Sequence, residues 1–175
     1  MARTARRTRT KAKPPWPAAG PAAETPIDET VFSILDTETT GLSAKQGGRV
    51  CELALLKVKG GEKLGMYQTL IDPRVPIEAG ARAVHGIDDS MVAGKPRFVD
   101  LSGELADRLK GTVMVCHNAS FDRGFLEHEF GVAGRTFPEI PVLCTLRIAR
   151  RHFEFSRNSL GVIAQELEIA PTGWA

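Results

Sequence analysis

The sequence predicts an α/β protein in which helices flank a single mixed sheet. Apolar runs rich in strand-forming residues recur along the chain, and segments with helical spacing lie between the later ones. Two of these runs are separated by little more than Gly60-Gly61, so they should pair as an antiparallel hairpin. The 175 residues contain no internal repeat, and their number is typical of one domain, which we place at 28–175.

The first three predicted strands lie between residues 31 and 71. Residues 31–35 form a short apolar run, and the polar segment 36–41 that follows is interpreted as a turn. The apolar run 50–58 predicts the second strand, and residues 64–71 predict the third. These last two form the hairpin, because the glycine pair between them permits a tight turn.

Helices are predicted over most of the next forty residues. Residues 77–84 should form a helix that stops at a His-Gly pair. Asp88 can cap a short helix over 89–93. Large apolar residues recur with helical spacing over 98–109, and Gly111 closes that helix.

The last part of the chain alternates between strands and helices. The wholly apolar segment 112–116 predicts a strand in the interior of the sheet. Asn118 can cap a helix over 119–130, with Gly131 as its stop. The remaining predicted elements are a strand at 142–144, a helix to about 152 and a helix over about 158–168.

Charge is distributed unevenly along the chain. The net charge is +2, but the first 23 residues carry six Lys and Arg and no acid, so the remainder carries −4. Residues 1–27 are also rich in proline and alanine, which predicts a disordered basic tail. The tail could bind phosphates weakly or merely aid solubility. The acidic body should not bind nucleic acid by bulk charge alone.

Composition excludes several classes of protein. No apolar stretch is long enough to cross a membrane or to form a secretory signal. The three cysteines, Cys51, Cys116 and Cys144, are odd in number and widely spaced, which disfavours a disulfide framework or a zinc knuckle. These features predict a cytoplasmic protein with no membrane partner.

Two carboxylates, Asp36 and Glu38, follow the first predicted strand. Side chains at alternate positions of a strand share a face, which puts these two on one side of the sheet. Like charges this close disfavour joint ionisation unless a cation lies between them, and carboxylate oxygens suit Mg²⁺ or Mn²⁺. An isolated Asp-x-Glu is more often a solvated turn, so this pattern alone does not identify a metal site.

A third carboxylate, Asp122, stands where the interior strand passes into a helix. It ends the segment His-Asn-Ala-Ser-Phe-Asp at 117–122 and lies in the first helical turn, where the helix dipole favours negative charge. Ligands of open mixed sheets gather at the carboxyl ends of strands, so Asp36, Glu38 and Asp122 can form one metal site. A plain helix-start acid would show the same pattern.

These segments resemble the motifs of a known family. Asp-Thr-Glu-Thr-Thr-Gly-Leu at 36–42 and the segment 117–122 are similar to the first two motifs of the DEDDh 3′–5′ exonucleases. The segments 48–53, 84–87 and 145–150 also match in order, and the resemblance spans about 30–174. The chain most resembles the proofreading (epsilon) subunits of bacterial DNA polymerase III. Oligoribonucleases of the same superfamily usually have a different first motif, which favours the proofreading branch but leaves RNA open as a substrate.

The resemblance implies a ribonuclease H-like fold, with a mixed five-stranded sheet flanked by helices, and two divalent cations, Mg²⁺ or Mn²⁺. It implies that Asp36 bridges both cations, that Glu38 binds the one carrying the attacking water, and that Asp122 binds the other. Two such cations clamp the attacking and leaving oxygens of an in-line displacement. The implied reaction releases nucleoside 5′-monophosphates from the 3′ end of single-stranded DNA, by a free nuclease or a polymerase subunit.

The resemblance also assigns substrate contacts. The residues implied to line the terminal nucleotide are Thr39, Thr40, Gly41, Leu42, His85, Asn118 and Phe121. Cys116 and His117 are neighbours on a strand and should point in opposite directions, so neither is expected to bind metal.

The family's third motif is a histidine followed five residues later by an aspartate, and no histidine of the 175 residues has such an acid in the matching context, since His117 and Asp122 belong to the second motif. In the family the histidine is the general base, the aspartate is the fourth metal ligand, and both lie on a C-terminal helix. We therefore expect the domain to lack this helix, to expose an apolar patch and to hydrolyse DNA very slowly or not at all. The alternative is a catalytically impaired module of the same fold that binds nucleic acid or a polymerase.

Overall fold

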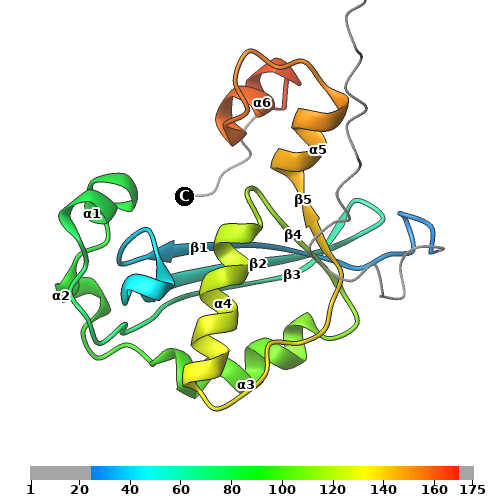
Figure 1. Ribbon diagram of the computed structural model, residues 1–175. Helices are drawn as coiled ribbons and strands as arrows, with labels where there is room; N and C mark the ends of the chain where they lie inside the picture. The colour runs from blue at the N-terminus through cyan, green and yellow to red at the C-terminus, as the bar shows by residue number, and fades with distance from the viewer. Residues whose placement is uncertain (1–24, 170–175) are drawn as a thin grey trace, which may run out of the picture.

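The computed structural model describes residues 25–169, so most of the predicted basic tail lies outside the described residues. Within them, one sheet has the strand order β3-β2-β1-β4-β5. β2 is antiparallel to both β1 and β3, whereas β1, β4 and β5 are parallel to one another. This mixed sheet with flanking helices confirms the predicted fold class (Figure 1). The strands are β1 (Phe32–Thr39), β2 (Val50–Lys59), β3 (Glu62–Leu70), β4 (Val113–Cys116) and β5 (Val142–Cys144).

The first strand is longer than the sequence predicted. The polar segment interpreted as a turn continues β1 through Thr39, because its backbone pairs with β2 from Ala54 to Val50. The register shifts between Glu38 and Thr39, where an irregularity of the β-bulge type breaks the ladder. The interpretation of residues 36–39 as a turn is therefore wrong, and pairing with β2 outweighs their polar character.

The helices lie close to their predicted positions. Asp88 caps the second helix as expected, because its carboxylate accepts hydrogen bonds from the amides of Ser90 and Met91. Two expectations for the fourth helix are wrong: it continues past Gly131, and Asn118 does not cap it but adopts a left-handed backbone with φ +68°. The helices are α1 (Ala79–His85), α2 (Asp89–Val92), α3 (Phe98–Leu109), α4 (Ser120–Val132), α5 (Thr145–His152) and α6 (Leu160–Glu166), with a 3-10 turn at Ala44–Gln46.

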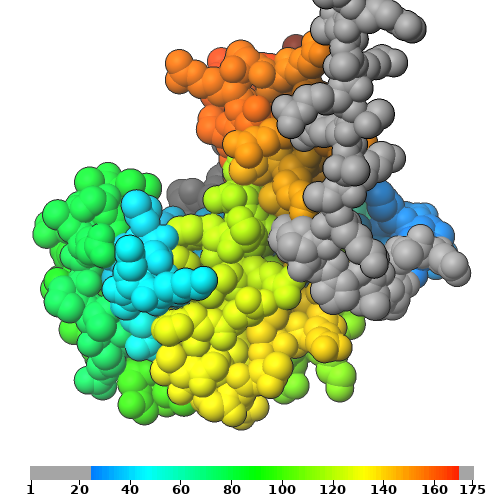
Figure 2. All heavy atoms as spheres, viewed as in Figure 1, coloured from blue at the N-terminus to red at the C-terminus, as the bar shows by residue number. Residues whose placement is uncertain are grey.

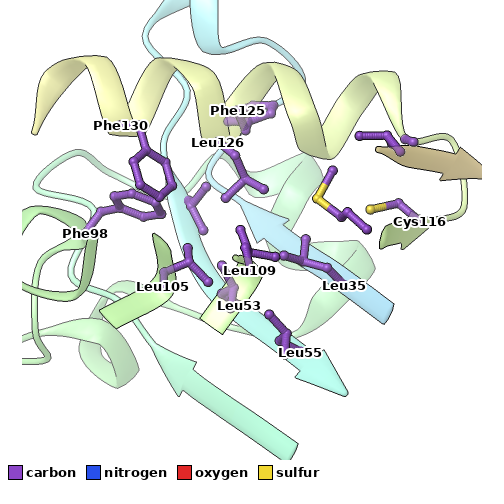
Figure 3. Close-up of a cluster of buried hydrophobic side chains, with 14 of the residues drawn as sticks. Leu35, Leu53, Leu55, Phe98, Leu105, Leu109, Cys116, Phe125, Leu126 and Phe130 are labelled. Carbon is purple, nitrogen blue, oxygen red and sulfur yellow. The ribbon is translucent and has the colours of Figure 1, made fainter. Parts of the chain in front are cut away.

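The core lies between the sheet and the helices α3 and α4. Alternate residues of the central strands, Leu35 on β1 and Leu53 and Leu55 on β2, are buried in this layer (Figure 3). The rings of Phe98 on α3 and Phe130 on α4 meet edge to face, with centroids 5.4 Å apart. None of the helices within 25–169 is long and apolar enough to span a membrane.

The opposite face of the sheet carries an apolar row across all five strands. Its members are paired in register: Met66, Leu56, Ile34, Val115 and Leu143. Exposed fractions of 39% for Ile34 and 41% for Leu143 are high for apolar side chains on interior or parallel strands. The expected exposed apolar patch is thus present.

Candidate active site

Asp36 and Glu38 lie near the end of β1, at positions that alternate with the buried Leu35 and Thr37. Burial raises the pKa of Asp36 above its usual range. Burial also raises the pKa of Glu38, and the negative charge of Asp36 raises it further. Glu52 on β2 is the register partner of Glu38 and adds negative charge beside both acids. Sequence reasoning did not single out Glu52, because Glu52 lies beside Glu38 only through the pairing of β1 with β2.

Asp122 reaches this end of β1 from the first turn of α4. Its side chain is 2% exposed, and its Oδ1 accepts hydrogen bonds from the Thr37 amide at 3.1 Å and the Thr37 hydroxyl at 2.9 Å. Burial raises the pKa of Asp122 to about 6, although the Thr37 hydrogen bonds lower it and the charge of Asp36 raises it again. The expected position in packed structure is confirmed. Thr37, which holds Asp122 in place, was missed by sequence reasoning.

The three acids interact with one another, but their side chains are not arranged as a complete set of metal ligands. Within residues 25–169, no three or more His, Cys, Asp or Glu side chains are grouped so that they could hold a metal ion. Asp36 nevertheless acts electrostatically on both Glu38 and Asp122. Burial raises the pKa of each of the three carboxyl groups by more than the nearby hydrogen bonds and histidines lower it. A cation would compensate their negative charge, so the chemistry of the donor set fits a divalent metal.

The end of β1 and the loop that follows it, residues 39–42, are held in place by hydrogen bonds. The Thr39 hydroxyl donates to the Gly41 carbonyl at 2.8 Å, and the Thr40 amide donates to the Arg49 carbonyl at 2.8 Å. The Thr40 hydroxyl is buried and accepts from the Arg49 amide at 3.0 Å. The side chain of Glu78 fills the space beside Gly41, and Leu42 projects outward with 86% of its surface exposed.

His85 joins α1 to this loop. Its Nδ1 accepts a hydrogen bond from the Ile87 amide at 3.0 Å, so the proton of the neutral ring resides on Nε2. Nε2 lies 3.2 Å from the Thr39 carbonyl oxygen, to which it donates. The structure thus brings His85 beside the acids, in a position that also ends a helix.

The junction of β4 and α4 supplies the other side of the site. Asn118 is exposed and holds the left-handed backbone noted above, a conformation often found at functional sites. The Phe121 ring packs on Phe125 with centroids 4.9 Å apart. His117 is bonded through both ring nitrogens, Nδ1 to the Thr145 hydroxyl at 2.9 Å and Nε2 to the Asn158 carbonyl at 3.0 Å.

The cysteines take no part in the site. Cys116 is 2% exposed and packs in the core between the sheet and α4. Burial is the main cause that raises its thiol pKa far above the usual range, so the thiolate that metals bind is strongly disfavoured. All three cysteines are free and buried.

Comparison with known proteins identifies the family. The sequence model of the exonuclease family RNase_T matches residues 33–173. The DNA polymerase III epsilon subunit of Salmonella typhimurium is 34% identical over 145 residues, which are 78% of this chain. The match spans 60% of the length of that relative.

Two solved structures share the fold. Exonuclease X in complex with 5′-overhanging duplex DNA has a TM-score of 0.63 and 30% identity, over 82% of this chain and 78% of that one. Product-bound exonuclease I has a TM-score of 0.73 and 13% identity, over 83% of this chain and 40% of that one. The sheet is therefore the ribonuclease H-like sheet of these nucleases. The chain belongs to the RNase_T exonuclease family, whose model matches most of its length.

Proposed function

We propose that the chain is a 3′–5′ exonuclease that hydrolyses the terminal phosphodiester bond of single-stranded DNA and releases nucleoside 5′-monophosphates. The observation that carries the proposal is the anchoring of Asp122 by Thr37 next to Asp36 and Glu38, across 85 residues of sequence. Family membership supports the reaction class. The likeness to an epsilon subunit supports DNA over RNA.

The three acids are the proposed holders of two divalent cations, Mg²⁺ or Mn²⁺. When bound, such cations activate water and stabilise the charge on the leaving oxygen. The negative charge of Asp36 raises the pKa of both Glu38 and Asp122. We therefore propose Asp36 as the carboxylate that the two cations would share. The Thr37 hydrogen bonds engage Oδ1 of Asp122, and we propose Oδ2 as its metal-binding atom.

The proposed contacts to the terminal nucleotide come from both sides of the acids. Thr39, Thr40 and Gly41 offer backbone groups, because the two hydroxyls already have partners within the loop. Leu42 is exposed and free to pack on a base. His85 keeps the loop in place through the Thr39 carbonyl. Asn118 and Phe121 line the opposite side, at the start of α4.

A second candidate is a nucleic-acid-binding module of the same fold with little catalysis. It is favoured by the lack, within residues 25–169, of a ready three-ligand metal group. Both candidates predict binding to DNA ends, and only the first predicts hydrolysis.

The likeness to an epsilon subunit also supports association with a DNA polymerase. This proposal implies a location in the bacterial cytoplasm, with which three free, buried cysteines agree.

The test is hydrolysis of a 5′-labelled single-stranded oligonucleotide under single-turnover conditions with excess protein and Mg²⁺ or Mn²⁺. Excess protein keeps the substrate bound, so that a single slow turnover can be observed. We expect a ladder that shortens from the 3′ end, loss of the reaction in Asp36→Ala, and no change in Glu62→Ala, whose exposed carboxylate lies on β3. Cleavage that survives Asp36→Ala would contradict the proposal. Binding without hydrolysis in the unaltered chain would favour the second candidate.

A further inference from the structure

Helix α5 concentrates positive charge in a body that is otherwise acidic. Arg147, Arg150 and Arg151 have the spacing i, i+3 and i+4, so they lie along one side of the helix. All three are exposed, and we call them the arginine stripe. The other side of α5 faces the protein, because Ala149 is 3% exposed and Leu146 packs against the core.

An aromatic pair directly follows the arginine stripe. The rings of Phe153 and Phe155 are stacked, with centroids 5.1 Å apart and an angle of 16° between their planes. Phe153 is 49% exposed, so a ring face or edge remains open to a ligand. Arginine side chains beside exposed aromatic rings are the combination that holds single-stranded nucleic acid, by phosphate contact and base stacking.

This segment is fastened to the candidate active site at both of its ends. Thr145 starts α5 and Asn158 follows the aromatic pair, and each is hydrogen-bonded to His117. His117 directly precedes Asn118, one of the residues proposed to contact the terminal nucleotide. The segment stands out from the body of the protein in the orange region of Figures 1 and 2. Helix α5 has eight residues and is therefore about 12 Å long.

We propose that the arginine stripe and Phe153 bind the nucleotides upstream of the 3′ end, with the arginines on phosphates and Phe153 under a base. This inference rests on the proposed function and names a binding surface for its substrate. Net charge supports it, because residues 24–175 carry −4 and would repel a polyanion without a local concentration of cations. Arginine also suits phosphate through its planar set of donors.

The test measures binding of the full chain, in EDTA to prevent hydrolysis, to fluorescent oligodeoxyadenylates of 3 and 12 nucleotides at several salt concentrations. Arg150→Glu combined with Arg151→Glu should weaken binding of the 12-mer at least tenfold and of the 3-mer less than twofold. The dependence of log affinity on log salt should flatten by about 1.4, from roughly 0.7 per lost phosphate contact. Phe153→Ala should weaken the 12-mer at least fivefold at every salt concentration, since stacking is not a charge effect.

A matched control is available at the far end of the sheet. Lys59→Glu with Lys63→Glu changes the net charge equally on the β2–β3 hairpin, where both lysines are exposed. This control should change affinity for either oligonucleotide less than twofold. Arg150→Lys with Arg151→Lys should retain the salt dependence, and the melting temperatures of all variants should agree within 2–3 °C, which is about 1 kcal/mol for a domain of this size.

Equal losses in the arginine-stripe and hairpin variants would overturn the inference, as would equal losses for the 3-mer and the 12-mer. Binding to anionic lipid vesicles that requires the stripe, without binding to the 12-mer, would overturn it in favour of a membrane. If the stripe variant loses 12-mer affinity but the unaltered chain hydrolyses no DNA, the surface stands and the exonuclease proposal fails. Hydrolysis with unaltered 12-mer binding in the stripe variant would reject the surface alone.

Discussion

Asp122 is the residue on which the candidate site depends most. It is a buried carboxylate whose two hydrogen bonds come from Thr37, and burial still raises its pKa to about 6. The native protein therefore binds a proton at Asp122 between about pH 4 and 6, where the unfolded chain does not. Stability must fall as pH rises through this window, and the loss is complete above it.

We predict that Asp122→Asn removes this loss. The amide oxygen can still accept from Thr37, and a buried negative charge disappears. The variant should match the unaltered protein near pH 4 and exceed its free energy of unfolding by about 2–3 kcal/mol at pH 7.5, from roughly 1.4 kcal/mol per pKa unit. Urea unfolding in EDTA across this pH range measures the difference. The exposed carboxylate of Asp107 provides the control, since Asp107→Asn should give a difference independent of pH. A constant offset for Asp122→Asn would refute the burial argument.

Reasoning from single residues named three acids as the candidate site but did not name the residues that hold them in place. Asp36, Glu38 and Asp122 carry a recognisable spacing and context, so they could be named in advance. Thr37 and Glu52 could not, because Thr37 bonds a residue 85 positions away and Glu52 arrives by strand register. Neither interaction leaves a local pattern in the sequence.

At the scale of elements, one buried ion pair fixes α4 against the start of β2. Glu129 on α4 is 1% exposed and accepts from Arg49 through Nε at 2.8 Å and Nη2 at 2.6 Å. The Val50 amide donates to the same carboxylate at 3.0 Å. Because Asp122 lies in the first turn of the same helix, this anchor also helps to set the position of Asp122 relative to β1.

We predict that Glu129→Ala lowers the free energy of unfolding by about 3 kcal/mol, because it leaves the Arg49 charge and a buried amide without their partner. Glu127→Ala on the same helix breaks only an exposed i,i+4 pair with Arg123 and should cost about 0.5 kcal/mol or less. Chemical denaturation of both variants provides the comparison. Similar losses would show that the buried pair contributes no more than a surface pair.

Periodicity predicted the type of every strand and α-helix, and tertiary contacts decided where β1 and α4 end. β1 continues through polar residues because β2 supplies ladder partners as far as Val50. α4 passes Gly131 because a glycine permits a helix stop without requiring one. The 3-10 turn at Ala44–Gln46 has no strong periodic signal and was not anticipated.

For the whole molecule, topology explains why one edge of the sheet collects the chemistry. β1 lies in the middle of the sheet, between the antiparallel hairpin and the parallel strand β4. The carboxyl ends of β1 and β4 therefore emerge side by side, which brings the first motif beside Asp122. Alternating strand and helix patterns predicted the fold class. The arginine stripe could not be related to the candidate site from the sequence, because that relation depends on the hydrogen bonds of His117 to Thr145 and Asn158.

The central claim is that Asp36, Glu38 and Asp122 form one divalent-cation site, and melting of the protein in the presence and absence of Mn²⁺ tests it most directly. A ligand at a hundred times its dissociation constant stabilises the native state by about 2.7 kcal/mol, or roughly 5–10 °C for a domain of this size. We predict such a rise for the unaltered chain and for Glu62→Ala, and no rise for Asp36→Ala. An equal rise in Asp36→Ala, or none in the unaltered chain at 10 mM Mn²⁺, would contradict the account.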